Sequence, residues 1–170
     1  HSAIFKWFRT YILLPLFMIC VLVVSGNGLV LAKGKAQIDV RKEKGFARLI
    51  LRFDKLPKYK TKSISTIFVV SFAEPISLDL GDLSAKLPKY ITVARQDPDG
   101  LGMRLAMLRE YKVNVMRVGH RMIIDIFSPN WRGQPPPMPQ DIIDELAAEA
   151  ESARRIEEER ARLEAMQLRP

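Results

Sequence analysis

The sequence predicts a mainly β protein, a small two-sheet sandwich preceded by a signal helix and followed by a charged helix. Three observations lead to this prediction. Apolar residues between 36 and 128 alternate with polar ones or form short blocks, as strands do. Residues 1–32 contain no acidic side chain, and residues 133–139 are rich in proline. The 170 residues therefore divide into a signal peptide, a basic β domain over 33–132, the proline-rich linker and a charged amphipathic helix over 140–170.

The first segment has the order of a secretory leader. Lys6 and Arg9 precede an apolar run from Tyr11 to Val24. The polar residues 25–28 follow, and the short side chains at positions 30 and 32 fit a signal-peptidase subsite. We expect cleavage after Ala32 and a periplasmic or cell-envelope location. The alternative is a retained inner-membrane anchor facing the periplasm, because the apolar stretch is just long enough to span if the polar residues 25–28 are tolerated.

The β domain is expected to contain short strands separated by turns. Residues 47–53 alternate, whereas Ile67 to Phe72 form a continuous block of the kind that is buried on both faces. Further strands are expected over 90–94, 103–107, 113–115 and 123–127. Asp97-Pro98-Asp99-Gly100 predicts a type I turn, and Gly119-His120 predicts a two-residue hairpin turn. Only Leu80 to Leu87 indicates a helical turn, which Pro88 ends.

Two stretches of this domain repeat the same order of features. Arg48 to Pro75 and Arg104 to Pro129 each consist of strand, basic turn, strand and a final proline. An internal duplication would explain the repeat, because neither half has a partner for its apolar face. Chance similarity between short strands is the alternative, and both interpretations stay open.

The residue types exclude most catalytic chemistry. Cys20 is the only thiol, and His1 and His120 are the only imidazoles, so neither a zinc cluster nor a nucleophile–histidine relay has the groups it needs. Asp97 and Asp99 begin like a calcium loop, but the later ligands are missing. We expect no enzyme activity, metal or cofactor. Because the chain starts at His1 and ends within a helical pattern, we also expect a piece of a longer product.

Near the end of the domain, Arg104-Leu105 is followed by Val118-Gly119-His120-Arg121-Met122-Ile123-Ile124-Asp125-Ile126. This pattern resembles the AMIN domain, a small β module of bacterial envelope proteins, over residues 36–130. Arg121 and Asp125 occupy the matching positions of its last strand. The resemblance implies a periplasmic module that helps to place amidases and secretion or division factors on peptidoglycan. The chain departs from the amidase members because no zinc-ligand set follows the domain.

Eight residues are candidates for binding an anionic ligand. They are Lys55, Lys58, Tyr59, Lys60, Lys62, Arg48, Arg52 and Arg121. The four lysines lie in an expected loop whose charge suits anionic glycan, peptide-stem carboxylates or lipid head groups. A solvated loop without a ligand is the alternative, and arginines on edge strands also serve to block aggregation.

The charge is divided between the two parts of the exported chain. Residues 33–132 hold 20 Lys or Arg and 10 Asp or Glu, a net charge of +10, whereas residues 133–170 hold 5 Arg and 9 Asp or Glu, a net charge of −4. The first prediction is a non-enzymatic module that binds peptidoglycan or an anionic envelope partner, and the alternative is a protein–protein interaction platform of a larger envelope protein. Nucleic acid is less favoured, because the leader directs the domain out of the cytoplasm.

The last segment predicts one long helix with Asp141 as its N-cap. Its apolar residues follow alternating four-and-three spacing, but Glu149 and Arg160 interrupt them. A solvated connecting helix is the first interpretation and a weak coiled-coil dimer the second. The overall layout resembles the N-terminal part of alphaproteobacterial envelope proteins that continue into tetratricopeptide repeats.

Overall fold

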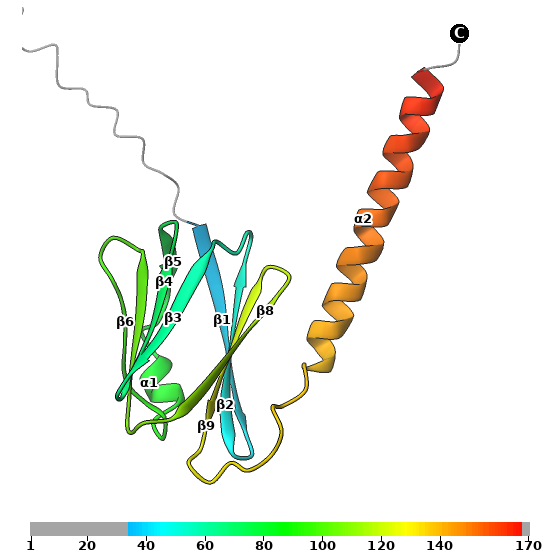
Figure 1. The fold of residues 1–170 in the computed structure, drawn as a ribbon. Coiled ribbons are helices and arrows are strands. Elements are labelled where there is room, and N and C mark those ends of the chain that lie inside the picture. Colours follow the sequence, from blue (N-terminus) through cyan, green and yellow to red (C-terminus); the bar gives the residue numbers. More distant parts are fainter. Residues whose placement is uncertain (1–33, 168–170) are drawn as a thin grey trace, which may run out of the picture. The chain divides into compact units, whose positions relative to one another are not determined.

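The computed structural model describes residues 34–167 as two β-sheets and a C-terminal helix (Figure 1). The elements are β1 (Gly34–Glu43), β2 (Phe46–Phe53), β3 (Tyr59–Ile64), β4 (Ile67–Phe72), β5 (Ile76–Leu78), α1 (Leu83–Lys86), β6 (Ile91–Gln96), β7 (Gly102–Met107), β8 (Lys112–Val118), β9 (Arg121–Phe127) and α2 (Gln140–Gln167). The predicted leader lies outside the described residues. No helix within 34–167 is long and apolar enough to cross a membrane.

The strands form a five-stranded sheet in the order β5-β1-β2-β9-β8 and a four-stranded sheet in the order β3-β4-β7-β6. Alternation along β2 explains the core: Ala47, Leu49 and Leu51 are fully buried and face the four-stranded sheet, where Val70 and Leu105 are also fully buried. The prediction of a mainly β, two-sheet domain followed by a helix is therefore confirmed.

The predicted turns are present in the structure. The amide of Gly100 donates a 2.9 Å hydrogen bond to the carbonyl of Asp97, which closes the predicted β-turn. Gly119 has φ +57°, a left-handed conformation, and joins Val118 to Arg121 in the β8–β9 hairpin. The helical turn predicted before Pro88 is the short helix α1.

Two local predictions were wrong. Strand β4 is not buried on both faces: Ile67 is 42% exposed, because no element of residues 34–167 covers the outer face of the four-stranded sheet. Asp141 is not the N-cap of α2, since the carbonyl of Pro139 accepts the first helical hydrogen bonds, from Ile142 at 3.1 Å and Ile143 at 3.2 Å.

The two repeated stretches have the same arrangement of elements. The first contributes β2 to the five-stranded sheet and the hairpin β3–β4 to the four-stranded sheet. The second contributes β7 to the four-stranded sheet and the hairpin β8–β9 to the five-stranded sheet. Each single strand therefore pairs with the hairpin of the other stretch, β2 with β9 and β7 with β4. This exchange gives both halves a partner for their apolar faces.

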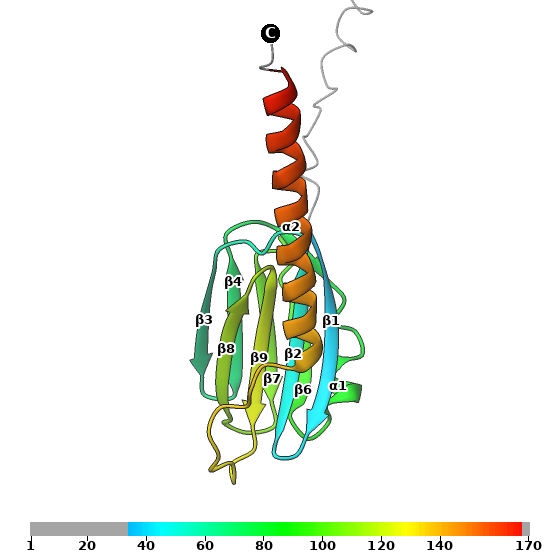
Figure 2. The ribbon, with the colours of Figure 1, turned by 90° about the vertical axis from the view of Figure 1, so that its right-hand side faces the viewer.

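Helix α2 begins on the outer face of the five-stranded sheet (Figure 2). Ile142 is fully buried there with Ile50 and Ile123, and Leu146 packs against the same cluster. The solvated-helix interpretation is therefore wrong for the first two turns. From residue 150 onward, the described side chains of the helix are exposed, as that interpretation expected.

Candidate anion-binding site

The predicted basic loop is largely an edge strand. β3 pairs with β4 on one side and ends the four-stranded sheet on the other. Lys60 and Lys62 belong to β3 and Lys58 precedes it, so their side chains share the outer face of the sheet at alternate positions. Lys55 lies in the preceding loop, where it is also exposed. Three of the four predicted lysines therefore form one row.

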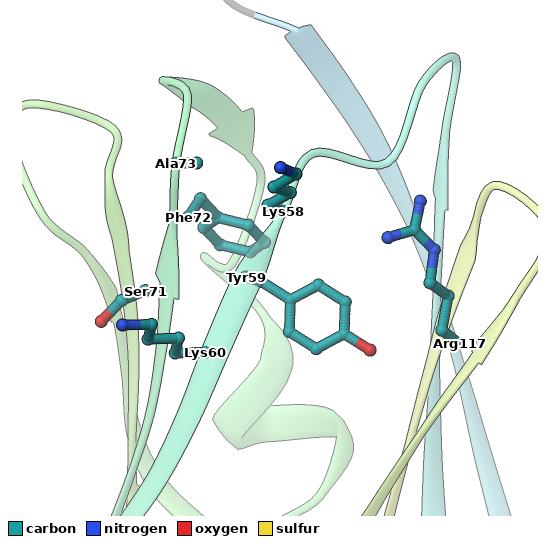
Figure 3. Close-up of a pocket in the computed structure, with 7 residues that line it drawn as sticks. All are labelled: Lys58, Tyr59, Lys60, Ser71, Phe72, Ala73 and Arg117. Carbon is teal, nitrogen blue, oxygen red and sulfur yellow. The ribbon is translucent and has the colours of Figure 1, made fainter.

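A hollow of about 750 Å³ lies beside this edge (Figure 3). It is lined by Lys58, Tyr59, Lys60, Ser71, Phe72, Ala73 and Arg117. Three predicted site residues are thus brought together, and they are joined by a guanidinium from the other sheet. No carboxylate is among the lining residues. Two ammonium groups, a guanidinium, a phenol and a hydroxyl place hydrogen-bond donors for a carboxylate or phosphate ligand around a hollow whose exposed surface is mainly apolar.

The hollow has side chains on both faces of β3. In Figure 3, Tyr59 extends toward Arg117, whereas Lys60 and Ser71 lie on the opposite side of the strand. Lys60 and Ser71 are opposite each other in the β3–β4 register, and Tyr59 is opposite Phe72. The site therefore surrounds a strand edge.

Arg117 is the functional candidate that the sequence analysis missed. It lies on β8, at the edge of the five-stranded sheet, and its Nη2 donates a 3.3 Å hydrogen bond to the carbonyl of Leu56. This bond joins β8 to the segment that leads into β3. One signal was present in the sequence, an arginine between Val115 and Val118 at an inward-facing position of a strand, but only the packing of the two sheets brings it to the lysines.

The three predicted arginines lie elsewhere, on the outer face of the five-stranded sheet. Arg48 is buried and binds both carboxylate oxygens of Asp125, at 2.6 and 2.8 Å. Its Nη1 donates a 2.9 Å hydrogen bond to the carbonyl of Pro137 in the linker. Because its donors are directed to groups of the same chain, Arg48 holds the linker against the sheet.

The other two arginines bind α2. Arg121 forms ion pairs with Glu145 at 2.7 Å and Glu149 at 2.5 Å, and Arg52 forms one with Glu145 at 3.2 Å. Hydrogen bonds from Arg52 and then Arg121 lower the pKa of Glu145, and Arg121 lowers the pKa of Glu149. Both carboxylates are therefore ionised at neutral pH. The eight candidates separate into a lysine edge and an arginine face that the helix occupies.

A second charge pair fixes the start of the helix. Arg41 on β1 donates hydrogen bonds to Asp141 at 2.6 and 3.0 Å, and to Asp39 at 2.8 and 2.9 Å. The hydrogen bonds from Arg41 hold the pKa of Asp141 down to about 2. The acidic residues at 141, 145 and 149 thus follow one face of α2 and meet cations of the sheet.

Comparison with known proteins yields little. No family model matches the chain, and no curated protein matches it. Among solved structures, the chain is similar to heat shock protein 16.0 from Schizosaccharomyces pombe, with 10% sequence identity and a TM-score of 0.32. The alignment covers 66% of this chain and 81% of that one. A likeness this weak carries no argument, so the functional conclusion rests on the site.

Proposed function

We propose that the chain is a non-enzymatic, AMIN-like binding module of the bacterial cell envelope, which attaches to peptidoglycan through the lysine edge of its four-stranded sheet. The leader would export the domain to the periplasm, with the membrane-anchored form as the alternative. The linker and helix would then separate the domain from a downstream region of the kind found in tetratricopeptide-repeat proteins. No catalytic residue, metal or cofactor takes part.

One observation carries this proposal. Lys58, Lys60 and Arg117 line one open hollow without a carboxylate among its lining residues, whereas Arg48, Arg52 and Arg121 are engaged by acidic groups of the chain itself. Peptidoglycan offers the matching chemistry, since its stem peptides carry carboxylates in an extended backbone. The positive field of the domain would also raise the rate of encounter with such a polyanion.

The test is retention on purified sacculi of residues 33–170, which form one compact unit with its own core. The native unit is compared with Lys55→Gln/Lys58→Gln/Lys60→Gln/Lys62→Gln. Because each lost contact is an exposed charge pair worth about 0.2–1 kcal/mol, the four changes together should weaken binding at least about fourfold.

The matched control is Lys35→Gln/Lys44→Gln/Lys89→Gln/Lys112→Gln, which removes the same charge from other exposed positions. We expect this variant to bind within about twofold of the native unit at 0.15 M salt, where charges more than about 8 Å apart are screened. Equal retention of all three proteins, or equal loss in both variants, would contradict a site at β3.

A protein–protein interaction platform is the second candidate function, and an exposed apolar row favours it. Ile64, Ile67 and Val93 are 53%, 42% and 44% exposed, and cross-strand pairing places them in one row with Ala106 on the bare face of the four-stranded sheet. This function predicts that the native unit crosslinks to an envelope protein and that Ile67→Asp abolishes the crosslink. It also predicts that sacculi retain neither the native unit nor the lysine variants.

A further inference from the structure

We propose that β3 accepts an extended acidic peptide of a partner protein as an added strand of the four-stranded sheet. The inference goes beyond the proposed function, because it assigns the binding energy to the backbone of β3 as well as to its lysines. The ligand is recognised by its extended backbone and by the alternation of its side chains. Its binding can therefore be measured without sacculi.

The backbone of β3 directs part of its N–H and C=O groups away from the sheet. The amide of Ala73 donates to the carbonyl of Lys58 at 2.8 Å, so Lys58 stands in a hydrogen-bonded position of the β3–β4 ladder. In an antiparallel ladder such positions alternate, which turns the N–H and C=O groups of residues 59, 61 and 63 away from β4. The amide of Phe72, opposite Tyr59, indeed bonds the other way, to Leu101 at 2.8 Å.

The space beside these groups is open in the described part of the chain. No strand of residues 34–167 lies beyond β3, and every residue from Lys60 to Ile64 is exposed. The hollow borders this free edge, with Lys60 on one face of the strand and Tyr59 and Arg117 on the other (Figure 3). An added strand needs room on both faces, since its successive side chains point to opposite sides.

The lysines of β3 exclude a second copy of this strand as the occupant. A symmetric antiparallel pairing centred on Thr61 would place Lys60 of each copy opposite Lys62 of the other. The neighbouring hydrogen-bonded registers, with Thr61 opposite Tyr59 or Ser63, bring Lys60 or Lys62 opposite its own copy. Like charges directly opposite each other destabilise a strand pair, and edge lysines protect against such self-association.

The same lysines select the occupant. Residues of an added strand that lie opposite Lys60 and Lys62 point to the outer face, where glutamate would form cross-strand ion pairs. The intervening residues point toward Tyr59 and Arg117, at the opening between the sheets, where apolar side chains fit beside the phenol ring. The ligand is therefore a segment in which acidic and apolar residues alternate, bound by backbone hydrogen bonds.

The probe is a fluorescein-labelled eight-residue peptide of alternating Glu and Val, titrated by anisotropy into the full chain in nonionic detergent. Two N-methylated versions separate strand addition from charge attraction. Methylation of the Val nitrogens removes the N–H groups that face β3, and we expect at least tenfold weaker binding. Methylation of the Glu nitrogens alters the N–H groups that point away, and binding should stay within about twofold of the parent peptide.

Two variants and one exchange measurement complete the test. Thr61→Pro removes an N–H group that points away from β4, and an edge strand tolerates proline at such a position. This variant should bind the parent peptide at least tenfold more weakly. Lys60→Gln/Lys62→Gln should weaken binding of the parent peptide about fivefold, because two cross-strand charge pairs are lost. In the native chain, saturating peptide should slow amide hydrogen exchange at Tyr59, Thr61 and Ser63 at least tenfold, whatever the folding yield of the variants.

Equal affinity for the two methylated peptides, unchanged exchange at those three amides, or no binding of the parent peptide at about 1 mM would overturn the inference. These outcomes are separate from the sacculus test. A chain that binds the peptide as a strand but is not retained by sacculi would refute the proposed function alone. The inference alone would be refuted by a second result: sacculi retain the native unit but not the quadruple lysine variant, and the native chain binds both methylated peptides with equal affinity.

Discussion

The outer faces of the two sheets have a similar chemistry but differ in whether other parts of the chain cover them. The five-stranded sheet places apolar residues, among them Ile50 and Ile123, beside arginines, and the linker and α2 cover them. The four-stranded sheet places Ile64 and Ile67 beside Lys62, and no part of residues 34–167 covers them. Within residues 34–167, the covered face is the one for which the chain supplies a complementary acidic helix.

One residue of the repeat illustrates the difference. Asp125 on β9 corresponds in the repeat to Ser71 on β4. Asp125 neutralises the buried Arg48 across the ladder. Ser71 has no charge, and the repeat counterpart of Arg48, Arg104, instead forms an exposed ion pair with Asp97 at 2.8 Å. The carboxylate at position 125 lets the first face be buried, because an unpaired guanidinium there would carry a large desolvation penalty.

The largest effect is therefore expected from Asp125→Ala. The change leaves Arg48 buried without its counter-ion and should lower the free energy of unfolding by about 3–5 kcal/mol, measured by urea denaturation. The double variant Arg48→Met/Asp125→Leu removes both charges and should recover most of the loss. A double variant as unstable as the single one would contradict the conclusion that the Arg48–Asp125 ion pair allows this face to be buried.

A smaller effect distinguishes the covered face from the bare one. Ile50 is fully buried beneath α2, so Ile50→Ala should cost about 2–5 kcal/mol of unfolding free energy. Ile67 is 42% exposed on the four-stranded sheet, and Ile67→Ala should change it by no more than about 0.5 kcal/mol. A large loss from Ile67→Ala would show that an unseen element covers the second face.

The smallest effect is the pH dependence of the helix contact. The pKa values of Glu145 and Glu149 lie below their ordinary 4.5, and that of Asp141 lies at about 2 instead of 3.8. Lowered pKa values mean that these groups stabilise the contact above pH 4.5 and lose this contribution as the pH falls toward 2. The methyl NMR shifts of Ile142, which is buried beneath this contact, measure the loss.

The matched variant for that titration is Glu145→Gln/Glu149→Gln, which should flatten the upper part of the pH profile. The ion pairs are partly exposed, so we expect a gradual loosening of α2 with the β domain still folded. Shifts of Ile142 that do not change between pH 5 and pH 2 would contradict an electrostatic contribution to the covered face.

The local features could be read from the sequence because they depend on neighbouring residues. The alternation over residues 47–53 defined β2, and Gly119 defined the β8–β9 turn through its positive φ. The lysines before and within β3 were recognised as a basic surface, and three of them share a face because alternate residues of a strand point to the same side.

The contacts that the sequence did not predict join segments far apart in the chain. Arg48 and Arg121 were predicted as ligand-binding residues, yet they meet Asp125 and the helix carboxylates. Arg117 was missed, although it faces the lysine edge across the gap between the sheets. Such contacts depend on strand register and sheet packing, which period-two patterns do not specify.

The sequence by itself determined the class of fold, the turns, the division of charge between domain and helix, and the position of the exposed lysines. Each of these follows from backbone preferences or from the polarity of residues within a few positions of one another. Only the tertiary structure decided which basic groups remain open to a ligand. A charged side chain is available to a ligand only where packing brings no partner of opposite charge to it. That partner can lie about a hundred residues away in the sequence, as with Arg41 and Asp141.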